Sequence, residues 1–403
     1  MKLKRIIVVG LTLLLLSSAC TQRDSFDARL RSIVKPYLFS ITGWEINTLS
    51  GAVRQTFTRP VKVDDEVGTV RQYFANVAEI RSLESELEVS GAEDRGKRTA
   101  LEAELNRLRE SQQELAGPVE RILRKQLTGV LTEEAIFSPV RNIKIHFPPV
   151  SFKLEKPPNA LVVSLRDRID SIREITLQPD LALSKVEDIE AGVDNLDVSS
   201  LVVGLGGLAA TYPALVDNDE DLRPTLEAIA HEWTHQYLTF KPLGFLYLLD
   251  VTGISRNYEV ATIDETVASM VGSELGTLVY EKYYAQYDKG DSGNQTVETG
   301  FDFDREMREI RRAVDAYLAK GEIDQAEQFM ESRRQYLVAQ GYYIRKLNQA
   351  YFAFYGTYAD SPTSISPIGL ALKQLRGERP SLKDFLNTAA GMTSQKKLED
   401  TVK

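Results

Sequence analysis

The run from Ala228 to Tyr237 constrains the fold of this chain more than any other feature. It places His231 and His235 four positions apart, so that on a helix both rings lie on one face. Neutral imidazole is a good zinc ligand, and two rings at this spacing can direct their nitrogens at one point. Glu232 lies beside the pair, where its carboxylate can reach a water molecule bound to the metal. The run therefore predicts a helix that carries a zinc (Zn²⁺) site.

Histidine is scarce, since the chain has 403 residues and only 3 histidines. Two of them stand in this motif, with glutamate in the position that a metal-dependent hydrolase needs. The neighbouring residues are apolar or small, as a buried helix requires. We expect this helix to begin near Asp221–Pro224 and to end at about Leu238.

A third ligand is needed, because a catalytic zinc ion takes three protein ligands and keeps one position open. The remaining histidine, His146, precedes two prolines on an expected strand far upstream and is the weaker candidate. Glu265 is the stronger one, because it opens an apolar helix in which Ala268, one turn later, is small enough to allow close approach. Asp264 would ligate instead if this helix were rotated by one residue, although an acid in a first turn is also favoured by the helix dipole.

The N-terminus reads as an export signal. A basic start is followed by the apolar run Ile6–Leu16, which is too short to span a bilayer, and then by small residues up to Cys20. This stretch resembles a bacterial lipobox, with Ser17 in place of the usual larger aliphatic residue. It predicts lipidation of Cys20 and an extracytoplasmic protein held on a bacterial membrane. Plain secretion with a free thiol is the alternative.

Composition excludes other classes. Cys20 is the only cysteine, so no disulfide can form within the chain. The formal net charge is −9, and no basic stripe with interleaved aromatics is present, so we expect no nucleic-acid partner. No second long apolar run follows the signal.

Residues 70–131 have a strongly helical pattern, with two apolar stripes separated by Gly91 and Gly96. The simplest structure is an antiparallel helical hairpin, which serves as a packed arm or binds a protein partner. Gly117-Pro118 is expected to end it, and Val119–Leu131 to form a further helix.

After Pro139 short β-rich runs alternate with helices. Strands are expected at Ile143–Phe147, Val150–Leu154, Ala160–Leu165 and Ser200–Tyr212, and a capping box at Ser184–Glu187 predicts a helix to about Leu196. From about Phe301 the chain reads as long helices. The fold class is α+β.

The HExxH run, completed by Glu265 and Ala268 on the next helix, resembles the gluzincin class of zinc metallopeptidases. More narrowly, Gly206–Gly272 is similar to bacterial lipoprotein predicted aminopeptidases, with a looser echo over Arg308–Tyr358. The resemblance implies a zincin-like two-lobed fold with a small mixed sheet, and a strand at Gly206 and Gly207 that runs antiparallel to the bound peptide. Those glycines equally suit a bulge or turn in an ordinary strand. Ser269 stands where gluzincins often have an aspartate that partners the first histidine, so Asp264 or Glu227 would have to serve.

The resemblance also implies the chemistry. His231, His235 and Glu265 would hold zinc, and Glu232 would act as general base. An oxyanion donor from the second lobe would be Tyr343, or its neighbours Tyr342 and Arg345. The substrate would be a peptide or protein.

The expected segments are a signal peptide at 1–19, a helical region with the hairpin at 20–135, an N-lobe with sheet and HExxH helix at 136–240, a helical C-lobe with the third ligand at 241–390, and a polar tail at 391–403.

Two other functions fit the same sequence. One is a catalytically silent envelope lipoprotein that uses a zincin scaffold to bind a partner. The other is cleavage of a non-peptide amide, such as a cell-wall crosslink.

Overall fold

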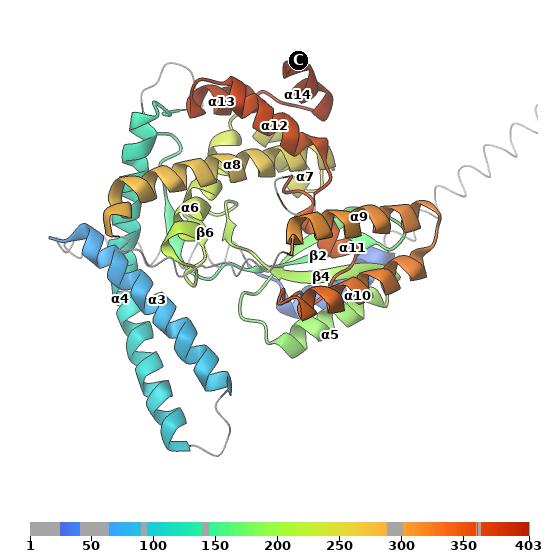
Figure 1. Ribbon diagram of the computed structural model, residues 1–403, viewed down its shortest axis with the longest axis horizontal. Helices are drawn as coiled ribbons and strands as arrows, with labels where there is room; N and C mark the ends of the chain where they lie inside the picture. Colours follow the sequence, from blue (N-terminus) through green and yellow to red (C-terminus); the bar gives the residue numbers. More distant parts are fainter. Residues whose placement is uncertain are drawn as a thin grey trace, which may run out of the picture. The chain divides into compact units, whose positions relative to one another are not determined.

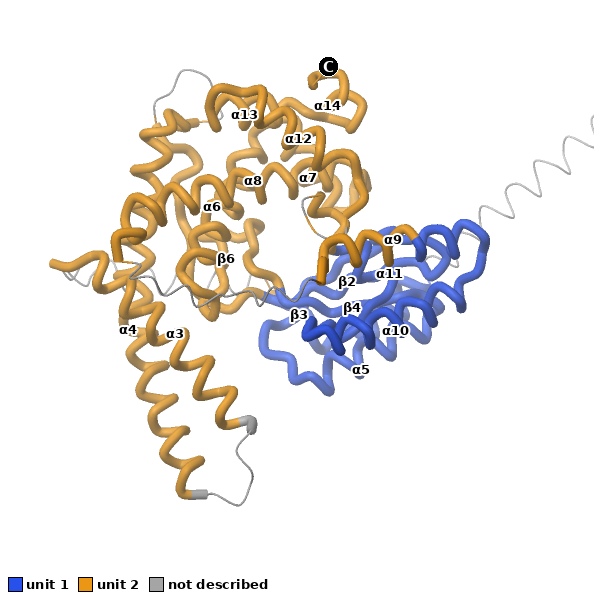
Figure 2. Tube along the Cα trace, in the orientation of Figure 1, with its two compact units in different colours: residues 1–39, 158–204, 313–354 blue, residues 40–157, 205–312, 355–403 orange. Residues whose placement is uncertain are grey.

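The computed structural model describes residues 25–40, 64–89, 95–138, 145–287, 301–359, 361 and 364–402. They form two compact units. Unit 1 takes Met1–Phe39, Pro158–Gly204 and Ala313–Phe354, and unit 2 takes the rest (Figure 2). Each unit combines a small sheet with helices, so the α+β class is confirmed. The expected signal peptide and Cys20 lie outside the described residues.

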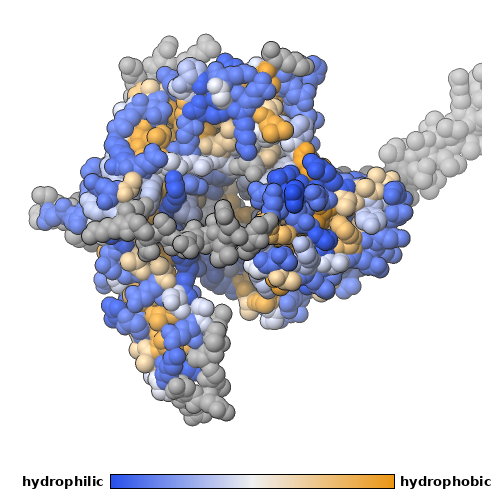
Figure 3. Space-filling model, viewed as in Figure 1, coloured by the Kyte–Doolittle hydropathy of each residue, from blue (hydrophilic) through white to orange (hydrophobic). Residues whose placement is uncertain are grey.

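Unit 2 contains the predicted hairpin as a long arm (Figure 1). Helix α3 (Glu66–Val89) and helix α4 (Arg95–Glu133) pack together along buried Ile80, Leu105 and Leu108. Figure 3 shows hydrophobic residues along this arm within a mostly hydrophilic surface. Ion pairs cross from one helix to the other at Lys97–Glu86, Arg109–Glu84 and Lys125–Glu66.

The expected break at Gly117-Pro118 is wrong, because α4 continues through Pro118 without interruption. Proline normally disrupts a helix interior, since it has no N–H and its ring crowds the preceding turn. Here the residues that follow are held by burial: Val119 and Leu123 are both fully buried in the core of unit 2. Packing on that side therefore outweighs the local signal.

The centre of unit 2 is a small mixed sheet with three helices. Strand β6 (Ala214–Val216) pairs parallel with β1 (Phe152–Leu154) and antiparallel with β5 (Gly207–Leu208), so β5 lies at an edge. Helix α6 (Leu222–Leu238) follows, within the bounds predicted from the sequence. Helix α7 (Pro242–Val251) then leads to helix α8 (Tyr258–Tyr283) and the short turn η2 (Ala285–Tyr287).

The C-terminal segment completes unit 2. It contains α12 (Pro367–Glu378), α13 (Leu382–Ala389) and α14 (Gln395–Thr401). The polar tail expected after Gly391 is wrong, because Met392 and Leu398 are buried in the core that also holds α8. Two apolar residues among lysines and acids are a weak sequence signal for a buried segment. Their role is revealed only by the surface of unit 2 on which they pack.

Unit 1 is built on an antiparallel sheet in the order β3-β2-β4. Its strands are β2 (Asn159–Leu165), β3 (Ser171–Leu177) and β4 (Val198–Gly204). Residues 25–34 are helical, and with α5 (Leu183–Asp194) they bury one apolar cluster against the sheet. The unit is completed by the second half of α9 (Phe303–Ala319), α10 (Ile323–Ala339) and most of α11 (Gln349–Tyr355), together with the turn η1 (Lys35–Tyr37).

Several expected elements differ from the structure. The single strand predicted at Ser200–Tyr212 is two strands, of which β4 belongs to unit 1 and β5 to unit 2. Residues 145–147 are not a strand, and β3 was not predicted. Helix α5 is not opened by the expected capping box, since its N-cap is Ala182 with no side-chain cap.

The division into units also differs from the expected boundary at 240/241. Residues 158–204 belong to unit 1, whereas 145–157 and 205–240 belong to unit 2. The chain therefore passes from one unit to the other several times, which strand and helix signals cannot reveal because they are local. Among the described residues, no helix is sufficiently long and apolar to cross a membrane.

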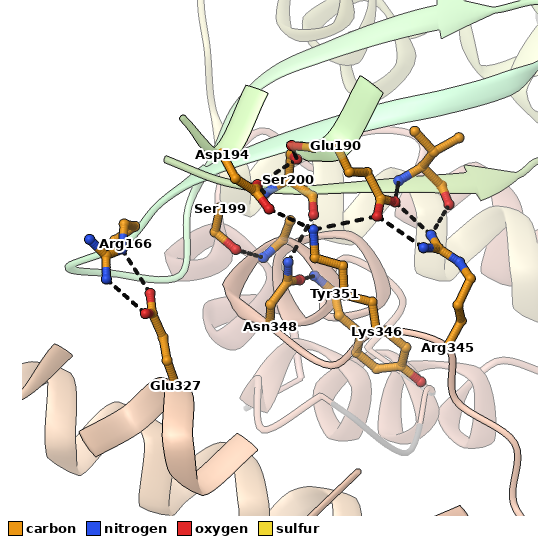
Figure 4. Close-up of polar contacts among 12 residues, drawn as sticks. Arg166, Glu190, Asp194, Ser199, Ser200, Glu327, Arg345, Lys346, Asn348 and Tyr351 are labelled. Atoms are coloured by element: carbon orange, nitrogen blue, oxygen red, sulfur yellow. Dashed lines mark hydrogen bonds and ion pairs between the residues drawn. The ribbon is translucent and has the colours of Figure 1, made fainter. Parts of the chain in front are cut away.

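A buried carboxylate ties helix α5 and the segment after α10 to the sheet of unit 1 (Figure 4). Glu190 on α5, which is 4% exposed, accepts hydrogen bonds from the Val202 backbone N–H at 2.7 Å and from both terminal nitrogens of Arg345 at 2.5 and 2.9 Å. The Lys346 ammonium lies 3.4 Å from the same carboxylate. Burial by itself would raise the pKa of Glu190, but the hydrogen bonds from Arg345 and the charge of Lys346 lower it below its ordinary value.

We expect Glu190→Gln to lower the free energy of unfolding by about 2–4 kcal/mol at pH 7, because Arg345 and Lys346 would lose their buried counter-charge. A carboxyl group whose pKa is lower in the folded than in the unfolded state stabilises the fold fully at pH values above its unfolded pKa. This stabilisation is lost as the pH falls through the folded pKa. The difference between wild type and variant should therefore shrink below about pH 4. Urea unfolding at several pH values measures it.

Glu331→Gln is the matched control, because Glu331 also pairs with an arginine of unit 1, Arg334, but is half exposed. It should cost less than about 1 kcal/mol. Equal losses in the two variants would contradict the structural role of Glu190.

Candidate metal centre

Helix α6 presents His231 and His235 on one face and anchors itself with the other side. Residues Leu226, Ile229 and Ala230 are buried in the core of unit 2. The indole N–H of Trp233, which is 2% exposed, donates to the Pro148 carbonyl at 3.0 Å. A hydrogen bond from a large buried ring fixes the rotation of the helix, and that rotation directs the two histidines.

Helix α8 approaches α6 so closely that only glycine fits at the contact. A Cβ atom at Gly272 would lie 2.9 Å from the Glu227 carbonyl oxygen and 3.0 Å from the Cβ of His231. At Gly276 it would lie 2.8 Å from the Glu227 nitrogen. Ala268, the small residue that we expected to allow close approach, is fully buried, and Gly272 and Gly276 are positions at which a side chain would not fit. Glu265 stands two turns before Gly272 on α8.

The two helices bring three ligand atoms together. The Nε2 atoms of His231 and His235 are 3.0 Å apart, and each lies 3.5 Å from Oε2 of Glu265. Tetrahedral zinc with bonds of about 2.0–2.1 Å separates its ligand atoms by about 3.3 Å. The observed triangle therefore has the size of one face of a zinc coordination tetrahedron.

The surroundings of these atoms also fit a metal ion. Oε2 of Glu265 is buried and has no hydrogen-bond partner, which is costly unless something else satisfies it. Nδ1 of His235 lies 2.7 Å from Oδ2 of Asp264, so this carboxylate can accept the Nδ1–H and leave Nε2 for a metal ion. Two nitrogens and one carboxylate oxygen are a donor set that suits zinc.

The electrostatics of the site depend on whether a cation is bound. Burial by itself would raise the pKa of Glu265, but the charges of His235 and His231 lower it well below its ordinary range. Burial likewise opposes charge on His235, whereas Glu265 and Asp264 raise its pKa well above 6.5. The pocket thus favours positive charge between these carboxylates, and a metal ion would have to displace the proton from His235.

Glu232 is held beside the same pocket. It is 7% exposed, and it accepts a hydrogen bond from the backbone N–H of Ala209, in the loop that follows β5. A Cβ at Gly207 would lie 2.2 Å from its Oε1, so β5 can run along this side chain only with glycine there. Burial raises the pKa of Glu232, which makes it a better proton acceptor than an exposed carboxylate. Gly206 meets no such neighbour, since open space surrounds its Cβ position.

The alternative third ligands are excluded by their contacts. Nε2 of His146 lies 2.9 Å from the Thr132 hydroxyl, and His146 is not part of the group of three ligands. Asp264 is fully buried and contacts the far nitrogen of His235, so it supports a ligand instead of being one. Asp264 thus contacts the second histidine and not the first, which was the one expected to have an acidic partner. Glu227, the other acid expected in that role, pairs with Arg223.

The oxyanion donors proposed from sequence lie in unit 1. The segment that contains Tyr342, Tyr343 and Arg345 follows the end of α10 at Ala339. It is not helical, although the sequence predicts long helices here. Tyr343 is 79% exposed and stays a prediction, whereas Arg345 is engaged by Glu190.

Two tyrosines of unit 2 stand at the site and were not predicted. The hydroxyl of Tyr247, on α7, donates to Oε1 of Glu265, and its ring stacks on His235. The ring of Tyr358 lies 6.5 Å from that of His231. Its segment is held to α8 by a 3.0 Å hydrogen bond from the Ala359 N–H to the Thr266 hydroxyl. The sequence offered only an apolar run around Tyr247 and no motif around Tyr358.

Comparison with known proteins adds no relative. No known protein family matches the chain, and neither a curated protein nor a solved structure matches it. Its function therefore has to be inferred from the residues gathered around His231 and His235.

We expect the purified chain to bind about one zinc ion and His235→Ala to lose it, because removal of one of three ligands leaves the others unable to hold the metal at high affinity. His146→Ala is the matched control, since it removes the remaining histidine from outside the site. Metal content by mass spectrometry after zinc reconstitution and dialysis measures both. Equal zinc in the two variants would contradict the assignment.

Proposed function

We propose that this chain is a zinc-dependent peptidase of the HExxH class with a zincin-like fold, exported and held at the outer face of a bacterial membrane by lipidated Cys20. The observation that carries the proposal is the triangle of His231, His235 and Glu265, with the buried carboxylate of Glu232 on the same helix. A scaffold that only binds a partner would not need a carboxylate in that position.

His231, His235 and Glu265 would hold the zinc ion. A zinc ion bound there supplies a Lewis acid toward a peptide carbonyl and toward a water molecule. Glu232 takes the proton of the attacking water and passes it to the leaving amine, for which its raised pKa is suited. The Ala209 N–H and the close contact with Gly207 keep its carboxylate in one position during both transfers.

Strand β5 supplies the binding surface for the peptide. It pairs with β6 on one side only and lies at the edge of the sheet, so an extended peptide can add to its other side. Gly206 has open space around its Cβ position, and Gly207 packs on Glu232. A peptide backbone bound to this strand would therefore lie beside Glu232, the proton acceptor.

Peptide hydrolysis in general is proposed, without a preference for the chain end. An aminopeptidase needs an anionic group near the free amine, and Glu259 and Asp264 are the acids of α8 that precede Glu265. Asp264 is occupied by His235, and Glu259 accepts a hydrogen bond from the Gln395 N–H at 3.1 Å.

We expect Glu232→Gln to lower peptide hydrolysis by about 10²–10⁴-fold and to keep its zinc, because the amide cannot accept the proton. Glu227→Gln, five residues earlier on α6 and 36% exposed, should keep full activity. A fluorogenic peptide library, assayed beside metal content, measures both. Wild type that binds zinc but cleaves no peptide would favour the silent scaffold, or cleavage of another amide, over the peptidase.

Tyr358 replaces Tyr343 in our proposal as donor to the oxyanion, because its ring is beside His231 within unit 2. Tyr358→Phe should lower kcat by about 10²-fold, the effect of removing one such donor, with little change in KM and zinc content. Tyr343→Phe serves as the comparison and should leave kcat unchanged. The reverse ranking of the two variants would return the role to Tyr343.

A further inference from the structure

Tyr247 touches two of the three ligand side chains at once. Its hydroxyl donates to Oε1 of Glu265, and its ring lies parallel to that of His235, with 5.3 Å between the centroids and 16° between the planes. Its position on α7, the helix that connects α6 to α8, makes both contacts possible. Among the described residues, the other polar contacts of the Glu265 carboxylate are with the two histidines.

The two oxygens of Glu265 are therefore divided between two tasks. Oε1 is occupied by the Tyr247 hydroxyl, whereas Oε2 faces both histidines and has no hydrogen-bond partner. A carboxylate can bind a metal through one oxygen or through both. A donor on Oε1 favours the first mode, because that oxygen would have to give up its hydrogen bond in order to ligate.

Helix α7, which carries Tyr247, is anchored to its neighbours near both of its ends. A Cβ at Gly244 would lie 2.2 Å from the carbonyl carbon of Leu238, so α7 begins in direct contact with the end of α6. The Leu243 N–H donates to the Ala390 carbonyl at 3.1 Å, and buried Asp250 accepts a hydrogen bond from the Asn257 N–H. The Tyr247 hydroxyl is therefore presented to Glu265 from a backbone that is anchored on both sides of it.

We propose that Tyr247 is a positioning residue that restricts Glu265 to one-oxygen ligation and thereby keeps a coordination position of the metal open. The inference rests on the proposed zinc site but not on peptide hydrolysis. A three-ligand site with an open position is the arrangement that separates a catalytic zinc centre from a structural one, so Tyr247 would decide which of the two this site is.

The test compares wild type with Tyr247→Phe, which removes the hydroxyl and keeps the stacked ring. Zinc affinity is measured by competition with a chromophoric chelator, and the visible spectrum of the cobalt-substituted protein reports the coordination number. We expect about 10–100-fold weaker zinc binding, as for other residues that support a ligand. We also expect weaker cobalt absorption, which indicates a change from four to five ligands.

Tyr284→Phe is the matched control. Tyr284 is a buried tyrosine of unit 2, and its hydroxyl likewise donates to a side chain, Oε1 of Gln126, at 2.7 Å. It should lower the melting temperature without changing zinc affinity or the cobalt spectrum.

Each outcome decides a separate point. Unchanged affinity and spectrum in Tyr247→Phe would overturn the inference, and so would weaker affinity with an unchanged spectrum. Wild type that binds neither zinc nor cobalt would reject the metal site itself. Loss of peptide hydrolysis alone bears on the proposed peptidase and not on Tyr247.

Discussion

The close contact between α6 and α8 is the constraint on which the rest of the site depends. At Gly272 and Gly276, α8 has no side chain in the interface, so its backbone rests on Glu227 and His231. Packing at that distance leaves no freedom in the separation of the helices, because protein interiors are as dense as molecular crystals. Glu265 consequently stands at 3.5 Å from both histidines, and a larger residue at either glycine would push α8 away from α6 and separate Glu265 from them.

Once the helices are fixed, the carboxylates around the histidines divide into distinct roles. Glu265 is held ionised by the positive charge of His235 and His231, whereas burial raises the pKa of Glu232. Asp264 orients the His235 ring from behind. In a buried site, neighbouring charges and hydrogen bonds, and not residue type alone, set the pKa of each carboxylate.

The sequence predicted the parts of this site that are local. The spacing of His231 and His235, the position of Glu232 and the bounds of α6 follow from helix geometry alone. The distance along the chain to an acidic residue at the start of an apolar helix indicated Glu265. The three ligands meet where that interpretation placed them, although α8 begins earlier than expected, at Tyr258.

The remainder depends on contacts between distant segments. Tyr247 looked like one more apolar position of a buried helix, and only the rotation of α7 directs its hydroxyl at Glu265. The run from Ser200 to Tyr212 has one hydrophobic pattern, yet its halves pair with different partners and form β4 and β5 in separate sheets. Continuity through Pro118 depends on the core that receives Val119, which the local signal does not contain.

X-ray absorption of the zinc-loaded protein tests the central claim most directly, because it reports the identity and distance of the ligand atoms. The account predicts two imidazole nitrogens and one carboxylate oxygen at about 2.0–2.1 Å, with a fourth light atom that completes a tetrahedron. A shell of six oxygens, or a spectrum without the scattering of two imidazole rings, would contradict it. In that case the triangle formed by His231, His235 and Glu265 would not be a zinc site.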